Sequence, residues 1–286
     1  MQTIILCRFS YPAEGGFQVD HDTVDERRAY LYNPARMEQR FQLFEHFCLP
    51  GLKAQTDPNF SFVVLVGSCF PAMYLSRLER LLRDMPQAII VSRDPGPHRL
   101  MCQSVLNAAR KHLNKPCLQV RHDDDDALAV DFVARLKKAA KDCKPLLQDN
   151  RLVGFDWNRG YTLCASEVAQ FEITETVTPY LGVAQAVAVQ GGVKQSLMNF
   201  AHSRINRFMP TVTFTAQPMF LRAYHDSNDS RQGAKVSKPD FFAPSVDHIE
   251  TLHRRFALTA DAVQAAFAPA VSTVPHAANR GHRLRQ

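Results

Sequence analysis

Residues 116–136 read PCLQVRHDDDDALAVDFVARL. An apolar-leaning stretch, four consecutive aspartates and a second apolar stretch follow one another directly. This order is typical of a strand whose carboxyl end carries acidic side chains. Neighbouring carboxylates repel one another and raise each other's pKa values, so a folded protein that keeps them together supplies or recruits a cation. The run Asp123–Asp126 is therefore the first candidate site, and a divalent metal with a phosphorylated ligand is the favoured interpretation.

Strands alternate with helices before this run. Short apolar runs predict strands at residues 3–9, 60–67, 87–92 and 116–120. Apolar residues at helical spacing predict helices at residues 37–48, 71–82 and 98–113. Such alternation predicts an α/β fold with a parallel sheet, in which ligands bind beyond the carboxyl ends of the strands. The strand at 60–67 is expected at the centre of that sheet.

The second half of the chain is richer in predicted strands. These lie at residues 152–155, 162–165, 185–189 and 211–215. A helix is predicted at 196–207, where His202, Arg204 and Arg207 form a cationic face. Such a face is typical of solvated surface, and contact with a membrane or a glycan lipid is the alternative interpretation. Residues 226–238 are polar and predict a loop.

Length and composition favour one large domain with a C-terminal extension, since the chain has 286 residues of which 45% are apolar. A net charge of +6 suits anionic partners. No stretch approaches the roughly 20 apolar residues of a membrane span. Seven irregularly spaced cysteines predict reduced thiols rather than a disulfide framework. We expect a cytoplasmic protein, with contact at the inner face of the membrane as a further interpretation.

Three segments carry a resemblance to a known family. Residues 108–128 resemble the helix, strand and D-x-D element of nucleotide-sugar glycosyltransferases with the GT-A fold. Together with QTDPNF at 55–60 and RAYHDSNDS at 222–230, they resemble more narrowly the rhamnosyltransferase family, over about residues 1–255. The resemblance implies an α/β, GT-A-like (Rossmann-like) mixed sheet flanked by helices, with a β-rich acceptor half and a C-terminal helical extension. Its expected parts are 1–130 (nucleotide-binding half), 131–255 (acceptor half) and 256–286 (helix and flexible basic tail).

The resemblance also implies a reaction and a metal. A sugar, rhamnose in the narrower family, would move from a nucleotide-diphosphate donor such as dTDP-rhamnose to a surface glycan or a lipid-linked glycan. Mn²⁺ or Mg²⁺ would neutralise the departing diphosphate. Carried over, Asp123 and Asp125 meet the ribose or the metal, and His225 is a second metal ligand. Asp124 and Asp126 are then donor-binding or structural, the alternative for Asp126 being a cap on the next helix.

Other candidate residues lie at strand ends. Arg8, Phe9, Arg93 and Asp94 occupy places where GT-A enzymes hold the base and diphosphate, and Arg99 is a further phosphate candidate. The alternative is surface arginines with a packed phenylalanine.

A general base is expected where a carboxylate lies beside an aromatic residue. Asp156, next to Trp157, is therefore the candidate catalytic base of an inverting reaction. The structural interpretation of Asp156, and Glu172 or Asp229 as the base, stay open.

Two other functions compete with glycosyl transfer. A metal-dependent phosphohydrolase or nuclease would use the same carboxylates to activate water. A non-catalytic carbohydrate or nucleic-acid binding module would use the basic surface. Under the leading interpretation no nucleic acid is expected as a partner.

Overall fold

The computed structural model describes residues 1–15, 21–225 and 239–269. A seven-stranded sheet forms its centre, in the order β10-β6-β9-β4-β1-β2-β3. The strands are β1 Gln2–Arg8, β2 Ser61–Gly67, β3 Ala88–Arg93, β4 Cys117–His122, β6 Leu152–Trp157, β9 Gln185–Val189 and β10 Thr211–Phe214. Within this sheet β9 runs antiparallel to both of its neighbours, and the other pairings are parallel. The carboxyl ends of β1 and β4 therefore meet at one edge.

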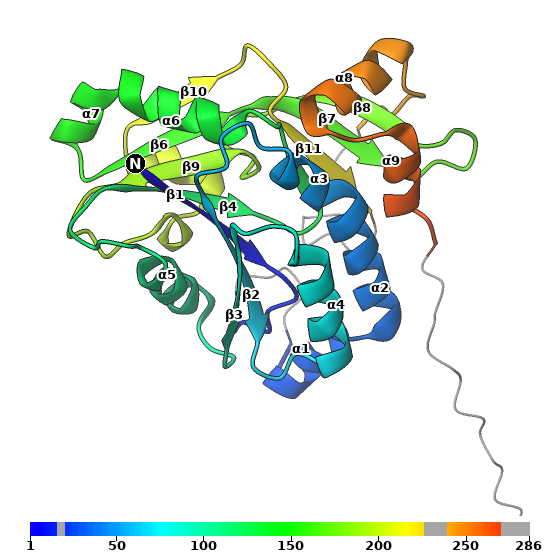
Figure 1. The fold of residues 1–286 in the computed structure, drawn as a ribbon, viewed down its shortest axis with the longest axis horizontal. Helices are drawn as coiled ribbons and strands as arrows, with labels where there is room; N and C mark the ends of the chain where they lie inside the picture. Colours follow the sequence, from blue (N-terminus) through cyan, green and yellow to red (C-terminus); the bar gives the residue numbers. More distant parts are fainter. Residues whose placement is uncertain (16–20, 226–238, 270–286) are drawn as a thin grey trace, which may run out of the picture.

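Helices cover both faces of this sheet (Figure 1). One face packs against α5 His98–Ala108 and the 3₁₀ helices η2 Leu197–Asn199 and η3 His202–Arg207. The other face packs against α2 Pro34–Leu43, η1 Phe44–Cys48, α3 Leu49–Lys53, α4 Ala72–Leu82 and α6 Phe132–Asp142. Alternate residues of a strand supply the two cores: Ile4 packs on the α5 side and Ile5 on the α2 side. The smaller helices are α1 Val24–Leu31 and α7 Lys144–Asp149.

The helical run from α2 through α3 is not uniform, because η1 is a π-helix. The Leu49 N–H donates to the carbonyl of Phe44, five residues earlier. Pro50 follows and has no N–H to give to His46, which interrupts the α-helical ladder. A π turn of this kind is frequent at functional sites.

The start of α2 is capped by a side chain: the Asn33 Oδ1 accepts from the Ala35 N–H at 3.0 Å.

A second, four-stranded sheet has the order β5-β11-β7-β8. Its strands are β5 Asp126–Leu128, β7 Arg159–Cys164, β8 Glu172–Val177 and β11 Phe220–Tyr224. In the antiparallel pair of β11 and β5, Arg222 lies opposite Asp126. The helices α8 Val246–Phe256 and α9 Ala260–Ala266 follow (Figure 1). The pairing brings the end of β11 beside the acidic run.

The predicted α/β class, a mixed sheet flanked by helices, is confirmed. The three strand–helix–strand units before the acidic run are parallel, as expected. All seven cysteines are free, with Cys7, Cys48, Cys102 and Cys117 buried. Within the described ranges, every helix is too short or too polar to traverse a bilayer.

Several element predictions were wrong. The strand predicted at the centre of the sheet, β2, lies next to the edge strand β3. The helix predicted at 196–207 is two short 3₁₀ turns with a break at Arg204. The short strand β5 and the strand β8 were not predicted. Helical structure at the C-terminal end begins at Val246, before the expected residue 256. The loop predicted at 226–238 lies outside the described residues.

Candidate functional site

A cavity of about 520 Å³ lies at the carboxyl ends of β1 and β4. This size is typical of small-molecule sites. Arginines and aspartates dominate its lining, with two histidines: Arg8, Arg36, Arg40, Arg99, Arg121, Arg222, Asp123, Asp124, Asp125, Asp126, His98 and His202. A third group of lining residues comes from the segments 181–185 and 197–202. The cavity therefore lies where the carboxyl-end rule for α/β sheets predicts a ligand.

Residues behind the acidic run hold it in place. The buried Gln55 side chain donates to the carbonyls of Gly51 (2.8 Å) and Ala129 (2.7 Å) and accepts from the Val133 N–H (2.9 Å). These bonds tie α3 to the segment between β5 and α6. Gln55 opens one of the three segments that carry the family resemblance, and its role in the fold is to fix the segment that follows the aspartates.

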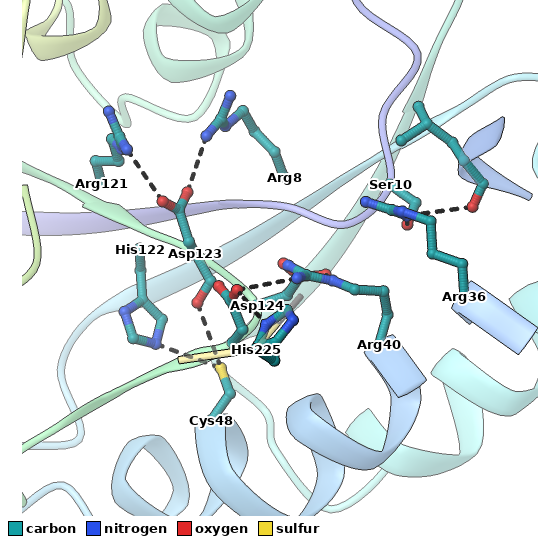
Figure 2. A network of polar contacts seen from close by, with 12 residues as sticks. Arg8, Ser10, Arg36, Arg40, Cys48, Arg121, His122, Asp123, Asp124 and His225 are labelled. Atoms are coloured by element: carbon teal, nitrogen blue, oxygen red, sulfur yellow. Dashed lines mark hydrogen bonds and ion pairs between the residues drawn. The ribbon is translucent and has the colours of Figure 1, made fainter. Parts of the chain in front are cut away.

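Asp123 lies between two guanidinium groups (Figure 2). Arg8 Nη2 donates to Asp123 Oδ1 at 2.9 Å, and Arg121 Nη2 donates to Oδ2 at 3.0 Å. Burial raises the pKa of Asp123, but the charges of Arg121 and Arg8 outweigh burial and hold the pKa well below its ordinary value. Asp123 is therefore an anion whose two oxygens are both engaged.

Asp124 and Asp125 share Arg40 from α2. Arg40 donates through Nε to Asp124 Oδ2 at 3.0 Å and through Nη1 to Asp125 Oδ2 at 2.9 Å. His225 Nε2 lies 3.0 Å from the same oxygen of Asp125. Burial raises the pKa of Asp125, but Arg40 and His225 lower it below its ordinary value. The corner is thus a closely packed arrangement of charges (Figure 2).

Asp126 differs from the other three. It is 6% exposed, and burial together with the charges of Asp125 and Asp123 raises its pKa well above the ordinary value. Asp126 belongs to β5, and the next helix begins at Phe132 with Asp131 at its N-cap position. The alternative in which Asp126 caps that helix is therefore wrong.

Arginine side chains supply the positive charge that the run of aspartates requires. Among the described residues, no three His, Cys, Asp or Glu side chains converge as a metal-binding group. Asp123 does not fit as a ligand, because two guanidinium groups engage its oxygens. Asp125 and His225 are the remaining candidate pair, and Arg40 Nη1 contacts the same Asp125 oxygen at 2.9 Å. Adjacent ligands of an octahedral ion at about 2.1 Å lie about 3 Å apart, and these two atoms are 3.0 Å apart.

Five of the predicted site residues are absent from the cavity lining: Phe9, Arg93, Asp94, Asp156 and His225. Of these, His225 contacts the lining residue Asp125. Phe9 is 0% exposed and packs against Phe41 and Phe44 at 4.9 Å, so the prediction that it stacks on a base is wrong. Arg93 and Asp94 are exposed at the end of β3 and do not line the cavity.

Asp156, the predicted base, is also absent from the cavity lining. It is 0% exposed at the end of β6, and its Oδ2 accepts from the Tyr180 N–H at 3.1 Å. Glu172, at the start of β8, accepts from Ser166 and Cys164, away from the cavity. Asp229 lies outside the described residues. Arg8 and Arg99 do line the cavity, as predicted.

Five charged or titratable residues of the cavity were not predicted as site residues: Arg36, Arg40, Arg121, Arg222 and His98. His202 was expected on a cationic helix face instead. One of them carried a usable signal. Arg40 lies three residues after Met37 and four before Phe44, so it falls on the apolar face of its helix. A charged residue there needs a buried partner of opposite charge, and the four aspartates were the obvious supply.

Two crystal structures of S. aureus TarS residues 1–349 are similar to this chain. The complex with UDP-GlcNAc is 10% identical, with a TM-score of 0.40, over 80% of this chain and 60% of that chain. A second structure is 11% identical, with a TM-score of 0.42, over 78% and 60%. The chain thus spans about 60% of the length of these structures. A comparison with curated proteins finds no match.

A family model matches much more of the sequence. It extends over residues 2–237 and therefore includes all three segments that carry the resemblance. These residues also contain both sheets and every residue of the cavity lining. On this match, the chain belongs to the family described as "Putative rhamnosyl transferase".

Proposed function

We propose that this protein is a glycosyltransferase that binds a nucleotide-diphosphate sugar in the arginine-lined cavity and transfers the sugar to a glycan. The observation that carries the proposal is the excess of arginines over aspartates in a cavity at the carboxyl ends of β1 and β4. A diphosphate is an anion of matching charge, and arginine binds phosphate oxygens through paired N–H donors. Membership of the rhamnosyl transferase family supports rhamnose as the sugar, with dTDP-rhamnose as the donor.

Arg121 is the residue best placed to receive the diphosphate. Its Nη2 donates to Asp123, which fixes the guanidinium beside the cavity. Its Nε is buried and has no hydrogen-bond partner among the residues that the structure describes. An unsatisfied buried donor on a cation costs free energy that a phosphate oxygen would recover. Asp123 accordingly acts by orienting Arg8 and Arg121.

A divalent ion at Asp125 and His225 is the second part of the proposal. Mg²⁺ or Mn²⁺ bound there would supply Lewis-acid neutralisation of the leaving diphosphate. Asp125 contributes an anionic oxygen and His225 an imidazole nitrogen. Arg40 contacts the same oxygen of Asp125, so it balances the carboxylate charge when no metal is bound. The acceptor that we propose is a surface glycan, free or lipid-linked.

Isothermal titration with dTDP tests both parts. Wild-type protein should bind dTDP, and removal of Mg²⁺ and Mn²⁺ with EDTA should weaken binding about tenfold. Arg121→Ala should weaken binding 10- to 100-fold through the loss of one or two charge-assisted bonds. Asp125→Asn should abolish the metal dependence. Arg93→Ala is the matched control, because Arg93 is exposed and outside the cavity, and it should bind as the wild type does.

Turnover is tested with a panel of sugar nucleotides that includes dTDP-rhamnose and UDP-GlcNAc. Release of the nucleoside diphosphate, measured by chromatography, should occur with at least one donor and should identify it. Hydrolysis of phosphomonoesters or phosphodiesters with no sugar nucleotide cleaved would instead support the phosphohydrolase interpretation. Absence of dTDP and UDP binding at millimolar concentration would contradict the proposed donor site.

A further inference from the structure

His202 lines the wall of the cavity made by the segments 181–185 and 197–202. The sequence predicts a helix in which His202 shares a cationic face with Arg204 and Arg207. The 3₁₀ conformation of η3 separates them: both arginines are exposed, whereas His202 is half-buried against the cavity. His202 therefore lies in the candidate site, and the proposal for donor binding assigns it no role.

The tautomer of His202 is fixed by its neighbour. His202 Nδ1 lies 2.9 Å from the carbonyl oxygen of Tyr180. A carbonyl can only accept, so Nδ1 carries the proton. In a neutral imidazole the other nitrogen, Nε2, then holds a lone pair and can accept a proton.

The ring orientation is fixed as well. A Cβ at Gly182 would lie 3.0 Å from both Cγ and Nδ1 of His202, so the ring packs directly on the backbone there. Gly182 has φ +96°, and its neighbours Tyr180 and Ala184 have φ of 60° and 51°. Left-handed conformations of non-glycine residues are strained and cluster at functional sites. The turn thus maintains a strained backbone that sets the position of His202.

Burial and the charge of Arg121 lower the pKa of His202, and the charge of Arg222 acts more weakly in the same direction. The hydrogen bond to Tyr180 and the charge of Asp123 raise it, without reversing the shift. His202 is therefore neutral at neutral pH, with its lone pair available. The other described carboxylates and histidines of the cavity are less suitable. Asp123, Asp124 and Asp125 are ion-paired, and His98 Nε2 accepts from Arg8. The pKa of Asp126 is raised well above its ordinary value by burial, which favours the protonated acid over the carboxylate that a base requires.

We propose that Nε2 of His202 is the general base of the transfer reaction, an inference that rests on the proposed function. The acceptor hydroxyl oxygen forms a bond to the anomeric carbon while the bond from that carbon to the phosphate oxygen breaks. The bonding electrons leave with the diphosphate, and the hydroxyl proton moves to Nε2. The resulting imidazolium keeps its Nδ1 bond to Tyr180 and later loses the proton to water. Such a single displacement inverts the anomeric configuration.

His202→Asn distinguishes a role as base from a purely structural role. The Asn amide can still donate to the Tyr180 carbonyl but has no basic nitrogen. With dTDP-rhamnose, or the sugar nucleotide of the panel that the wild type cleaves fastest, kcat should fall 10²- to 10⁴-fold. Affinity for dTDP should stay within threefold. The limb of the kcat/KM profile in which activity rises with pH should disappear. Added imidazole should restore part of the activity of His202→Ala, and Arg204→Ala, the exposed control, should match the wild type.

Two outcomes would overturn the inference and leave the proposed function intact: a wild-type kcat in His202→Asn, or a product that retains the anomeric configuration by NMR. A His202→Ala variant that folds and binds dTDP but gains nothing from imidazole would also count against it. If the wild-type protein cleaves no sugar nucleotide, the proposed function itself has failed. The two failures are therefore distinguishable.

Discussion

Asp156 and His202 hold the backbone of one residue, Tyr180, from its two sides. Asp156 accepts from the Tyr180 N–H at 3.1 Å, and His202 donates to the Tyr180 carbonyl at 2.9 Å. Burial raises the pKa of Asp156, but the carboxyl does not line the cavity. Its geometry is that of a positioning residue that acts on the reaction through the Tyr180 backbone.

Substitution of Asp156 should therefore depend on hydrogen bonding rather than on charge. Asp156→Asn keeps an acceptor for the Tyr180 N–H and should retain kcat within about threefold, whereas Asp156→Ala should lower kcat about 10- to 100-fold by misplacing His202. Steady-state donor cleavage measures both. If Asp156→Asn lost as much kcat as Asp156→Ala at every pH, Asp156 would have to be assigned as the base instead.

His98 gives the protein a pH-dependent stability. Burial and the charge of Arg8 lower the pKa of His98 to about 3, with Arg121 and Arg99 adding to the shift and Asp123 opposing it. Between pH 6.5 and 3 the unfolded chain binds a proton at this position that the folded chain does not. Stability should therefore fall as the pH falls through this window.

The size of this effect can be isolated with His98→Gln, which keeps an acceptor for Arg8. From pH 7 to pH 5 the free energy of unfolding in urea should fall by up to about 2 kcal/mol more in the wild type than in the variant. Equal falls in both proteins would show that His98 is protonated in the folded state at pH 5.

Single residues also show where sequence reasoning stops. The aspartate run correctly indicated a need for positive charge, because that need follows from composition alone. The identity of the charge could not follow, since Arg8 and Arg40 lie 115 and 84 residues from their partners Asp123 and Asp124. Phe9 lies at the end of a strand, where a residue that stacks on a base is expected. Its burial against Phe41 of α2 and Phe44 of η1 depends on tertiary packing that the sequence does not display.

Helix α2 contributes a buried cation to the site through Arg40, whose side chain is 8% exposed. Removing one partner of a buried ion pair leaves uncompensated charge and costs about 3–5 kcal/mol. Arg40→Met should destabilise the protein by that amount in urea unfolding. Arg80→Met, an exposed arginine on α4, is the control and should change stability by less than about 0.5 kcal/mol.

The double variant Arg40→Met with Asp124→Asn should lose less stability than the sum of the single variants, because the second change removes a carboxylate that the first left unpaired. Strict additivity would mean that the contact between Arg40 and Asp124 contributes nothing to folding.

Among the elements, long apolar runs were predictable and short irregular ones were not. The strands β1, β2 and β4 bury apolar side chains, which the sequence displays directly, whereas the apolar run of the edge strand β3 stays partly exposed. β5 has three residues and exists because it pairs with β11, about 90 positions later. The segment 196–207 was predicted as one helix, but its short turns pack into the core that α5 and the sheet form. Tertiary contacts determined both outcomes.

On the scale of the whole molecule, the cavity lies where two sheets meet. Arg8, Arg121 and Asp123 extend from the ends of β1 and β4, whereas Asp126 and Arg222 belong to strands of the smaller sheet. His225 follows β11 and contacts the cavity residue Asp125. The sequence predicted the first sheet through its alternating strands and helices, and with it the edge at which the site lies. The second sheet depends on pairings between distant segments, and for this reason the set of cavity residues could not be derived in advance.

The π turn of η1 makes helix length part of this assembly. Arg40 contacts Asp124 and Asp125, and Cys48 Sγ lies 3.3 Å from His122 Nε2. In a regular α-helix, residues eight positions apart point about 80° away from each other. The wider turn rotates less per residue and brings the two side chains nearer one direction. Relatives that lack one amino acid between Phe44 and Cys48 would need a different thiol or a different arginine to support the same corner.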